Sequence, residues 1–271
     1  MFHRFIARLF LTACLVFPLS ADAASILSKK QDYTLQYGLY GGGFQALDAG
    51  IRFKFDKTAY TASMNAKPSG ALGYLLPWNG KFNTKGLIKS NRLIPQLYTK
   101  QSSWRGDKAQ MELAYDKNGK FVSKSEGVNK NMAVDPELYK DSVDVLTSIV
   151  NMLVRVNDEG TCNADVMTYD GKRRYRMVFR DKGVEELPPS KVNIFKGKAR
   201  RCQMELIPVA GFKGQKSRGY YMLQEQGRKL GSLPMVWVGP AWEGGPYVPV
   251  RILMKNDYGT MLVHLMKATR N

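Results

Sequence analysis

The stretch "TYDGKRRYRMVF", residues 168–179, predicts a β-hairpin. Asp170-Gly171 is a favoured two-residue turn, because both residues tolerate the positive φ angles that tight hairpin turns require. We therefore expect a strand over 166–169 and a second, antiparallel strand over 172–179. In the second strand one face would enter the core and would bear Tyr175, Met177 and Phe179, with Arg173 on the same face close to the turn.

The other face of this strand is basic, with Lys172, Arg174 and Arg176. Cations interleaved with aromatic rings are typical of nucleic-acid surfaces, where they contact phosphates and bases. The alternative is a solvent-exposed strand face that pairs with nearby carboxylates. We favour the solvent-exposed face, and we treat these three residues as a candidate surface for anionic partners.

The N-terminus is typical of a cleaved secretory signal. Arg4 and Arg8 precede an apolar run of 11 residues, 9–19, which is too short to span a bilayer, and Ala21-Asp22-Ala23 has the small-x-small form of a cleavage site. We expect removal of residues 1–23 and a single exported β domain over 24–271. Residues 11–14 also spell a lipoprotein box that would place a lipid on Cys14. Because the apolar run continues past Cys14, plain cleavage is favoured.

Export changes what the positive charge means. The whole chain has a formal net charge of +18, and without residues 1–23 it keeps 39 basic and 22 acidic residues, or +17. In the periplasm such a protein meets anionic lipid headgroups and peptidoglycan carboxylates and no genome. We therefore expect a periplasmic protein with no nucleic-acid partner. No later segment is apolar over about 18 residues, so no membrane span is expected.

Two cysteines, Cys162 and Cys202, remain after cleavage. Two thiols in an oxidising compartment most simply form a disulfide, and the C-x-x-C spacing of redox proteins is absent. Closing a loop of about 40 residues would stabilise the fold by about 3–4 kcal/mol in the chain-entropy model.

The rest of the chain predicts further antiparallel strands and one long helix. Apolar and polar residues alternate over 33–39, 51–55 and 60–64, and turn signals follow at Gly106-Asp107, Asn118-Gly119 and 257–259. A helix is expected over 136–156, with Asp135 as N-cap and Pro136 in the first turn. Its broad apolar stripe indicates burial against the sheet. One or two helical turns are expected over 69–76.

A resemblance to a known family extends over nearly the whole predicted mature chain. The segments that resemble it are "YTLQYGLYGGGFQALDAGIRF" (33–53), "DVLTSIVNML" (144–153), "YDGKRRYRMVF" (169–179), "KARRCQMELIPVAGF" (198–212) and "YVPVRILMKNDYGTMLVHLMKAT" (247–269). They are similar to a family of exported bacterial proteins defined by a domain of unknown function. The resemblance implies a mainly β fold, in which a strongly curved antiparallel sheet, an open barrel or β-spiral, wraps around one central helix. The implied fold is similar to that of the lipoprotein carriers LolA and LolB and of the β-spiral envelope-integrity proteins. The resemblance also implies a Cys162–Cys202 pair and no catalytic residues.

Catalytic and cofactor motifs are scarce. His264 is the single histidine after cleavage, so a zinc site or a Ser-His-Asp triad is not expected, and the sequence predicts no cofactor and no metal. Gly41-Gly42-Gly43 fits a turn or bulge better than a phosphate loop. Glu185 and Glu186 are adjacent and would face opposite sides of a strand. We expect that the protein is not an enzyme. The alternative is a hydrolase or transferase that acts on envelope polymers.

The predicted function is therefore that of a non-catalytic periplasmic cell-envelope protein. With 13 Met, 14 Tyr and 4 Trp, the concave face of a curved sheet either holds an acyl chain or is filled by its own core. An envelope lipid, a lipoprotein, a peptidoglycan strand or a protein partner is the expected class of ligand. The candidate ligand-binding residues, at a gap on one rim of the sheet, are Tyr74, Leu75, Trp78 and Trp242.

Cleavage of the predicted signal can be tested directly. Native protein should begin at Ala24, because the Ala-x-Ala site lies directly before it. Intact-mass spectrometry of protein purified from the periplasmic fraction measures this. A mass that includes residues 1–23, or a diacylglyceryl adduct on Cys14, would contradict the prediction.

Overall fold

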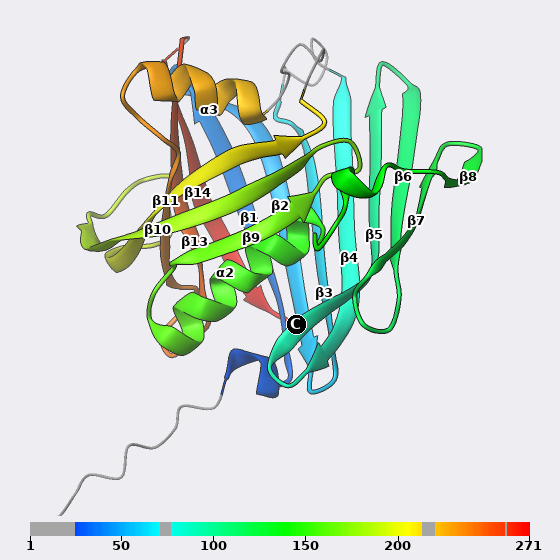
Figure 1. Ribbon diagram of the computed structural model, residues 1–271. Coiled ribbons are helices and arrows are strands. Elements are labelled where there is room, and N and C mark those ends of the chain that lie inside the picture. Colours follow the sequence, from blue (N-terminus) through cyan, green and yellow to red (C-terminus); the bar gives the residue numbers. More distant parts are fainter. Residues whose placement is uncertain (1–24, 71–76, 213–219, 258) are drawn as a thin grey trace, which may run out of the picture.

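A single antiparallel sheet of fourteen strands dominates the computed structural model, which describes residues 25–70, 77–212, 220–257 and 259–271 (Figure 1). The first eight strands are β1 (Gln31–Gly41), β2 (Phe44–Asp56), β3 (Ala59–Pro68), β4 (Trp78–Lys89), β5 (Arg92–Trp104), β6 (Asp107–Tyr115), β7 (Phe121–Glu126) and β8 (Asn129–Met132). The other six are β9 (Ala164–Tyr169), β10 (Arg174–Leu187), β11 (Gly197–Ala210), β12 (Met235–Pro240), β13 (Tyr247–Asn256) and β14 (Gly259–Arg270). The helical turns expected over 69–76 lie mostly outside the described residues.

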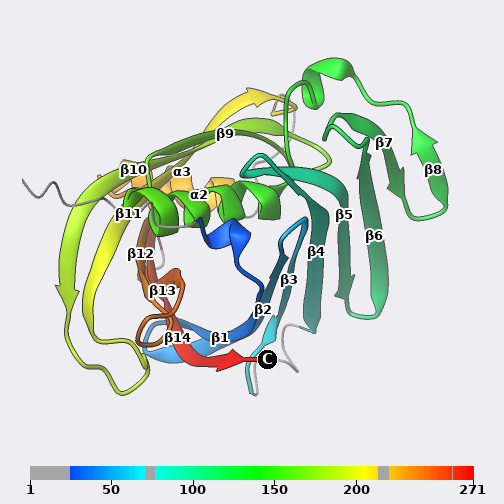
Figure 2. The same ribbon diagram turned by 90° about the horizontal axis from the view of Figure 1, so that it is seen from below.

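The sheet consists of two meanders that meet where β1 pairs with β14. The spatial order is β8-β7-β6-β5-β4-β3-β2-β1-β14-β13-β12-β11-β10-β9, so each half runs strand by strand in sequence order. The pairing of β1 with β14 joins the halves, for example through Tyr33 opposite Arg270. Figure 2 shows the sheet curling into an open, barrel-like wall whose two edges are β8 and β9. The predicted fold class, a strongly curved antiparallel sheet around one central helix, is confirmed.

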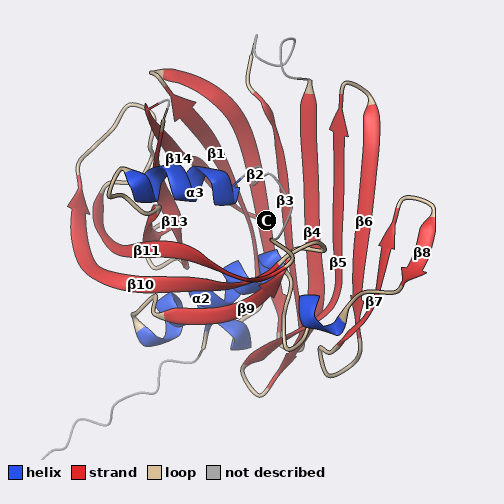
Figure 3. Ribbon diagram, turned by 45° about the horizontal axis from the view of Figure 1, so that its top comes forward, coloured by secondary structure: helices blue, strands red, loops and turns tan. Residues whose placement is uncertain are grey.

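In the described part of the chain, four helical segments accompany the sheet (Figure 3). They are η1 (Ile26–Ser28), η2 (Pro136–Leu138), α2 (Val145–Glu159) and α3 (Tyr220–Lys229), of which η1 and η2 are single 3-10 turns. Helix α3 packs against β11 and β13. Its Gln224 side chain accepts a hydrogen bond from the backbone N–H of Leu206 and donates one to the carbonyl of Leu206, at 2.6 and 2.9 Å. These bonds satisfy the backbone N–H and carbonyl of Leu206, which lies on β11 beyond the last residue pair between β11 and β12.

The predicted helix over 136–156 is wrong in its first part. Asp135 caps only η2, and Asp141 has a left-handed φ of 52°, which interrupts the helix. Helix α2 starts after Asp144, whose carboxylate accepts from the backbone N–H of Thr147, and it ends at Gly160 with a φ of 66°. The chain therefore has two N-cap aspartates in succession, and the second one starts the long helix.

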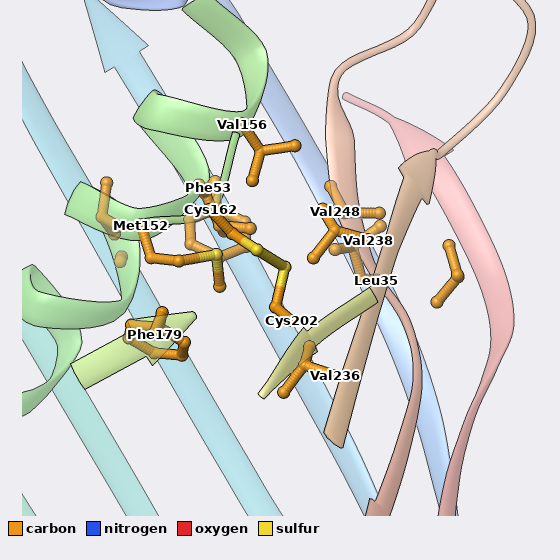
Figure 4. Close-up of a cluster of buried hydrophobic side chains, with 14 of the residues drawn as sticks. Leu35, Phe53, Met152, Val156, Cys162, Phe179, Cys202, Val236, Val238 and Val248 are labelled. Carbon is orange, nitrogen blue, oxygen red and sulfur yellow. A yellow bond between two sulfur atoms is a disulfide. The ribbon is translucent and has the colours of Figure 1, made fainter. Parts of the chain in front are cut away.

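Helix α2 lies inside the curl of the sheet and forms the centre of the core. Its buried side chains pack with apolar residues of both half-sheets, among them Leu35 and Phe53 from the first half and Phe179 and Val238 from the second (Figure 4). Because the helix is buried on several sides, its polar residues need internal partners.

A polar network holds the start of α2 against the first half-sheet. Asp144 is 0% exposed, and it accepts hydrogen bonds from the hydroxyls of Thr147 at 2.6 Å and of Thr84 on β4 at 3.0 Å. Tyr60 of β3 adds a hydroxyl contact of 2.8 Å to Thr147. Burial raises the pKa of Asp144 above its ordinary value, and the hydrogen bonds oppose that rise.

A disulfide holds the other end of α2 against the second half-sheet. Cys162, shortly after Gly160, is bonded to Cys202 on β11, with the two Cα atoms 6.1 Å apart, and both side chains are buried (Figure 4). The predicted disulfide is thus present in the structure. The disulfide and the Asp144 network therefore attach the two ends of α2 to the two half-sheets.

The hairpin over residues 168–179 forms with a longer turn than the sequence predicts. Pairing ends at Tyr169 opposite Arg174, and the backbone N–H of Asp170 donates to the carbonyl of Arg173 at 3.1 Å, so the loop has four residues. The Asp170 carboxylate accepts from the backbone N–H groups of Lys172 and Arg173, which stabilises the wider turn. Tyr175, Met177 and Phe179 are buried, as predicted.

Loss of the disulfide should weaken the fold without removing its topology. Protein in which Cys162 and Cys202 are both replaced by Ser should lose about 2–5 kcal/mol of unfolding free energy, because the closed loop of 40 residues no longer restricts the unfolded chain. Urea denaturation of protein lacking residues 1–23 measures the loss, and reduction of the wild type provides the control. Two free thiols in unreduced, denatured wild-type protein would contradict the bond.

Candidate functional site

An open pocket of about 470 Å³ lies at one rim of the sheet, where β1 begins, β14 ends and the hairpin between β12 and β13 turns. Its volume is above about 300 Å³, the lower end for ligand sites. Three segments far apart in sequence form its walls: residues 26–33, the end of β14 and the loop that contains Trp242. The β1–β14 pairing places the start of β1 and the end of β14 side by side at this rim.

Trp242 forms the aromatic wall of the pocket. Its ring meets Tyr33 edge-on at a centroid distance of 5.9 Å, and the guanidinium carbon of Arg270 lies 4.9 Å from the indole centroid. A Cβ atom on Gly245 would lie 2.6 Å from the indole Nε1, so a side chain there would collide with the ring. The indole N–H is buried and has no hydrogen-bond partner among the described residues.

Asn157 of α2 fixes the loop that holds Trp242. Its carboxamide oxygen accepts from the backbone N–H of Tyr247 at 2.8 Å, and its nitrogen donates to the carbonyl of Tyr247 at 3.0 Å. The backbone N–H of Gly245 donates to the carbonyl of Trp242 at 2.9 Å. The aromatic wall is therefore attached to the central helix and held in place.

Positive charge exceeds negative charge in this pocket. Lys29, Lys30 and Arg270 line it, and none of them forms an ion pair with a described residue. The one carboxylate side chain in the lining, Asp32, accepts two hydrogen bonds from Arg52, at 2.7 and 2.8 Å, and one from Asn271 at 3.0 Å. These partners, Arg52 first, lower the pKa of Asp32 to about 2. Asp32 is thus an anion already neutralised by its neighbours.

The side chains that line the pocket suit an anionic ligand. Three unpaired cations attract a phosphate or carboxylate, and the indole ring offers an apolar face. Among the described residues no group of three or more His, Cys, Asp or Glu side chains is placed to bind a metal ion. The described helices include none with both the length and the apolar content to cross a membrane.

A comparison with family models identifies the chain. The model described as "Protein of unknown function (DUF3108)" matches residues 32–266. The chain belongs to this family. No curated protein sequence matches the chain. Among solved structures, the crystal structure of a β-barrel-like protein of the domain of unknown function DUF1849 from Brucella abortus is similar, with a TM-score of 0.51 and 10% sequence identity. The match covers 90% of this chain and 99% of that chain, and at this identity it shows a shared fold alone. The similarity to LolA and LolB stays a prediction.

The pocket described above, lined by Lys29, Lys30, Asp32, Trp242 and Arg270, is here called the rim pocket. The other candidate ligand-binding residues do not line it. Tyr74 and Leu75 lie outside the described residues. Trp78 begins β4, opposite Trp104 of β5, at the end of the sheet where β3 finishes. Because β1 starts at the opposite end of the sheet, Trp78 and Trp242 do not share a site. Trp242 is thus the one candidate among the described residues that lines the rim pocket.

The basic face of the hairpin is largely neutralised. Arg176 is exposed and forms an ion pair with Asp165, and the Lys172 Nζ lies 3.8 Å from Glu126. Arg174, in contrast, is only 8% exposed, and its guanidinium donates to the carbonyl of Glu137 in η2 at 3.3 Å. The prediction that Arg174 faces water is wrong, because η2 packs over the first residue of β10. These three residues do not form one continuous cationic surface.

The cations of the rim pocket are the part of the site that the sequence did not reveal. Lys29 and Lys30 precede β1, whereas Arg270 is at the end of β14, and only the β1–β14 pairing brings them together. No local spacing pattern encodes a contact over such a sequence separation. The one available signal was the prediction that the Trp242 loop lies at a rim.

The different environments of the hairpin cations predict different substitution effects. Replacing both Lys172 and Arg176 by Gln should leave the Tm nearly unchanged, because exposed ion pairs contribute little. Arg174→Gln should lower the Tm by about 3–6 °C, since it removes a buried hydrogen bond under η2. Calorimetry of the two variants gives the comparison, and equal effects would refute the assigned burial.

Proposed function

We propose that this DUF3108 protein is a non-catalytic periplasmic protein of the cell envelope that binds an anionic envelope component at the rim pocket. The observation that supports the proposal is the convergence of Lys29, Lys30 and Arg270 beside Trp242, where the lining carboxylate of Asp32 is already paired with Arg52. Uncompensated cations grouped in a concave site raise the local concentration of anions.

The proposed location is supported by two independent features. The N-terminal sequence is typical of a secretory signal. The Cys162–Cys202 disulfide is the kind of bond that forms and persists in oxidising compartments. In the periplasm, phosphate groups of lipid headgroups and carboxylates of peptidoglycan are the abundant anions.

An acyl chain fits the rim pocket poorly. The concave side of the sheet is filled by α2 and by packed side chains such as Leu35, Phe53 and Phe179, and the rim pocket itself has a mostly polar lining. Buried hydrocarbon needs an apolar lining, whereas lysine and arginine favour a charged group. The ligand is therefore proposed to enter with its anionic group rather than with a hydrocarbon tail.

The alternative, a hydrolase or transferase acting on envelope polymers, needs a carboxyl group that exchanges protons near neutral pH. Asp32 is the carboxylate side chain in the rim pocket, and its lowered pKa of about 2 makes it a poor general acid and a weak base. The arrangement thus favours binding over acid–base catalysis.

The proposal is tested by removing charge from the pocket. A double variant with Lys30→Gln and Arg270→Gln should bind anionic partners about tenfold more weakly at low ionic strength. The matched control is a double variant with Lys85→Gln and Lys108→Gln, which removes two exposed, unpaired lysines outside this pocket.

Two probes distinguish the source of the anion. Co-sedimentation with phosphatidylglycerol vesicles measures binding to a lipid headgroup, and pull-down with purified peptidoglycan sacculi measures binding to glycan or peptide carboxylates. Loss of binding in either assay for the rim variant, with the control variant like the wild type, supports the proposal and identifies the source. Wild-type protein that binds neither probe, or a rim variant that binds as the wild type does, would overturn it.

A further inference from the structure

The outer face of the first half-sheet contains a second, separate hollow. Two adjoining spaces of about 640 and 350 Å³ lie over β1 to β4, and Gln36, Gly50, Asn65 and Lys81 line both of them. The shared lining makes them one continuous groove. In β1, Gln36 alternates with Leu35 and Tyr37, which are buried, so its side chain lies on the face opposite to the core.

A glycine on β2 forms the floor of this groove. Gly50 has no side chain, and a Cβ atom there would lie 2.5 Å from the carboxamide oxygen of Asn65 on the neighbouring strand. The Asn65 side chain therefore occupies the space above Gly50 that a side chain at position 50 would otherwise fill. A larger residue at position 50 would displace it and fill the middle of the groove.

The register of the strands arranges the groove lining in parallel rows. The central row crosses the sheet through Gln36, Gly50, Asn65 and Lys81. A row on one side includes Thr34, Arg52, Ser63 and Asn83, and a row on the other includes Asp48 and Lys67. Since successive outward residues of a strand are about 6.6–6.8 Å apart, the three rows extend over about 13 Å along the strands.

Several side chains in this groove have no partner within the described chain. Gln36, Ser63 and Asn65 form no side-chain hydrogen bond, and Lys67 and Lys81 form no ion pair. The two lysines are diagonal neighbours on adjacent strands, because Lys81 is opposite Asn65 and Lys67 follows two residues later. At the usual diagonal separation of about 7–8 Å, like charges repel each other.

The acidic residue of the groove does not compensate both lysines. Asp48 is opposite Lys67 but forms no ion pair with it within 4.0 Å, and its carboxylate is held by a hydrogen bond from the Gln45 carboxamide at 2.5 Å, so one anion faces two cations. Arg52 is held by Asp32. An anionic group placed between Lys67 and Lys81 would relieve their repulsion and would find no internal competitor within 4.0 Å of either ammonium group.

The composition of the groove restricts the class of ligand. Carboxamide and hydroxyl side chains both donate and accept hydrogen bonds, which suits a partner rich in hydroxyl groups. The two lysines add a requirement for negative charge. The groove is open at the surface, and its lining combines these polar side chains with apolar ones, among them Tyr37, Met64 and Met266. An open groove with a mixed lining suits a segment of an extended sugar polymer, which has hydroxyl groups and apolar ring faces, better than an enclosed small molecule.

From this placement we propose that the outer groove binds a segment of an anionic polysaccharide. The polysaccharide runs along β2 and β3. Its acidic group lies between Lys67 and Lys81, and its hydroxyl groups form hydrogen bonds with Asn65 and Gln36. This site is distinct from the rim pocket, since the Asp32–Arg52 ion pair stands between them: Asp32 lines the pocket and Arg52 lines the groove.

The test uses a linear polysaccharide of defined charge. Oligogalacturonate has one carboxylate per sugar, and its methyl ester of the same length has the same hydroxyl groups without the charge. In isothermal titration at low ionic strength, a double variant with Lys67→Gln and Lys81→Gln should bind oligogalacturonate about tenfold more weakly than the wild type. Asn65→Ala should weaken binding without changing its salt dependence, because it removes hydrogen bonds and no charge.

Two control variants separate this proposal from the rim pocket and from net charge. The Lys85→Gln and Lys108→Gln double variant loses the same charge outside the groove and should bind like the wild type. The Lys30→Gln and Arg270→Gln variant should also bind oligogalacturonate normally, even if the rim-pocket proposal fails. Equal binding by the groove variant and the wild type, or binding of the methyl ester as tight as that of the acid, would overturn the proposal. Wild-type protein that binds phosphatidylglycerol vesicles through Lys67 and Lys81 but not the oligosaccharide would overturn it as well.

Discussion

Burial of α2 between the two half-sheets is the constraint on which the rest of the structure depends. A helix surrounded by protein cannot leave its first N–H groups or its capping carboxylate to water, so Asp144, Thr147, Thr84 and Tyr60 form a closed network at its start. At its other end the covalent bond between Cys162 and Cys202 provides the attachment. The network connects the helix to β4 and the disulfide connects it to β11. The curl of the sheet follows, since each half must reach the same helix from its own side.

The distribution of charge is more informative than the net charge. The hairpin after Asp170 has the densest run of basic residues, yet its cations lie against Asp165, Asp170, Glu126 or Glu137. Cations without such partners line the rim pocket and the outer groove instead. A carboxylate in ion-pair contact cancels most of the field of its arginine beyond a few ångströms, so a paired cation attracts a distant ligand weakly. The sites proposed to recruit anions are therefore not those where the sequence is most densely basic.

Local patterns predicted the parts of the fold that depend on neighbours in sequence. Alternation over 33–39 and 51–55 identified strands, and Asp170-Gly171 located a hairpin, although its turn is wider because the Asp170 carboxylate accepts hydrogen bonds from the backbone N–H groups of Lys172 and Arg173. The start of α2 was misplaced because Asp135 and Asp144 are both good N-caps. The left-handed backbone at Asp141, which decides between them, is not visible in a hydrophobic pattern.

Features that depend on distant residues could not be predicted in this way. Arg174 occupies an outward position of an alternating strand, and only the packing of η2 above it makes it buried. Likewise, the rim pocket needs residues near 30 and 270 to be adjacent, and this follows from the β1–β14 register rather than from any motif. Of the candidate site residues, Trp242 lines the rim pocket because its loop follows a strand end, which a sequence reading can locate.

The pairing of β1 with β14 also has a consequence for the order of events during folding. Strand β1 precedes all other strands of this sheet in sequence and β14 (Gly259–Arg270) follows them all, so the middle of the sheet cannot form before β14 has been synthesised. Until then each meander can form from local hairpins, but β1 and β13 present unpaired edges. Until β14 is synthesised, the sheet of a nascent chain with this topology is open between β1 and β13, and any factor that protects it must cover the free edge of β1.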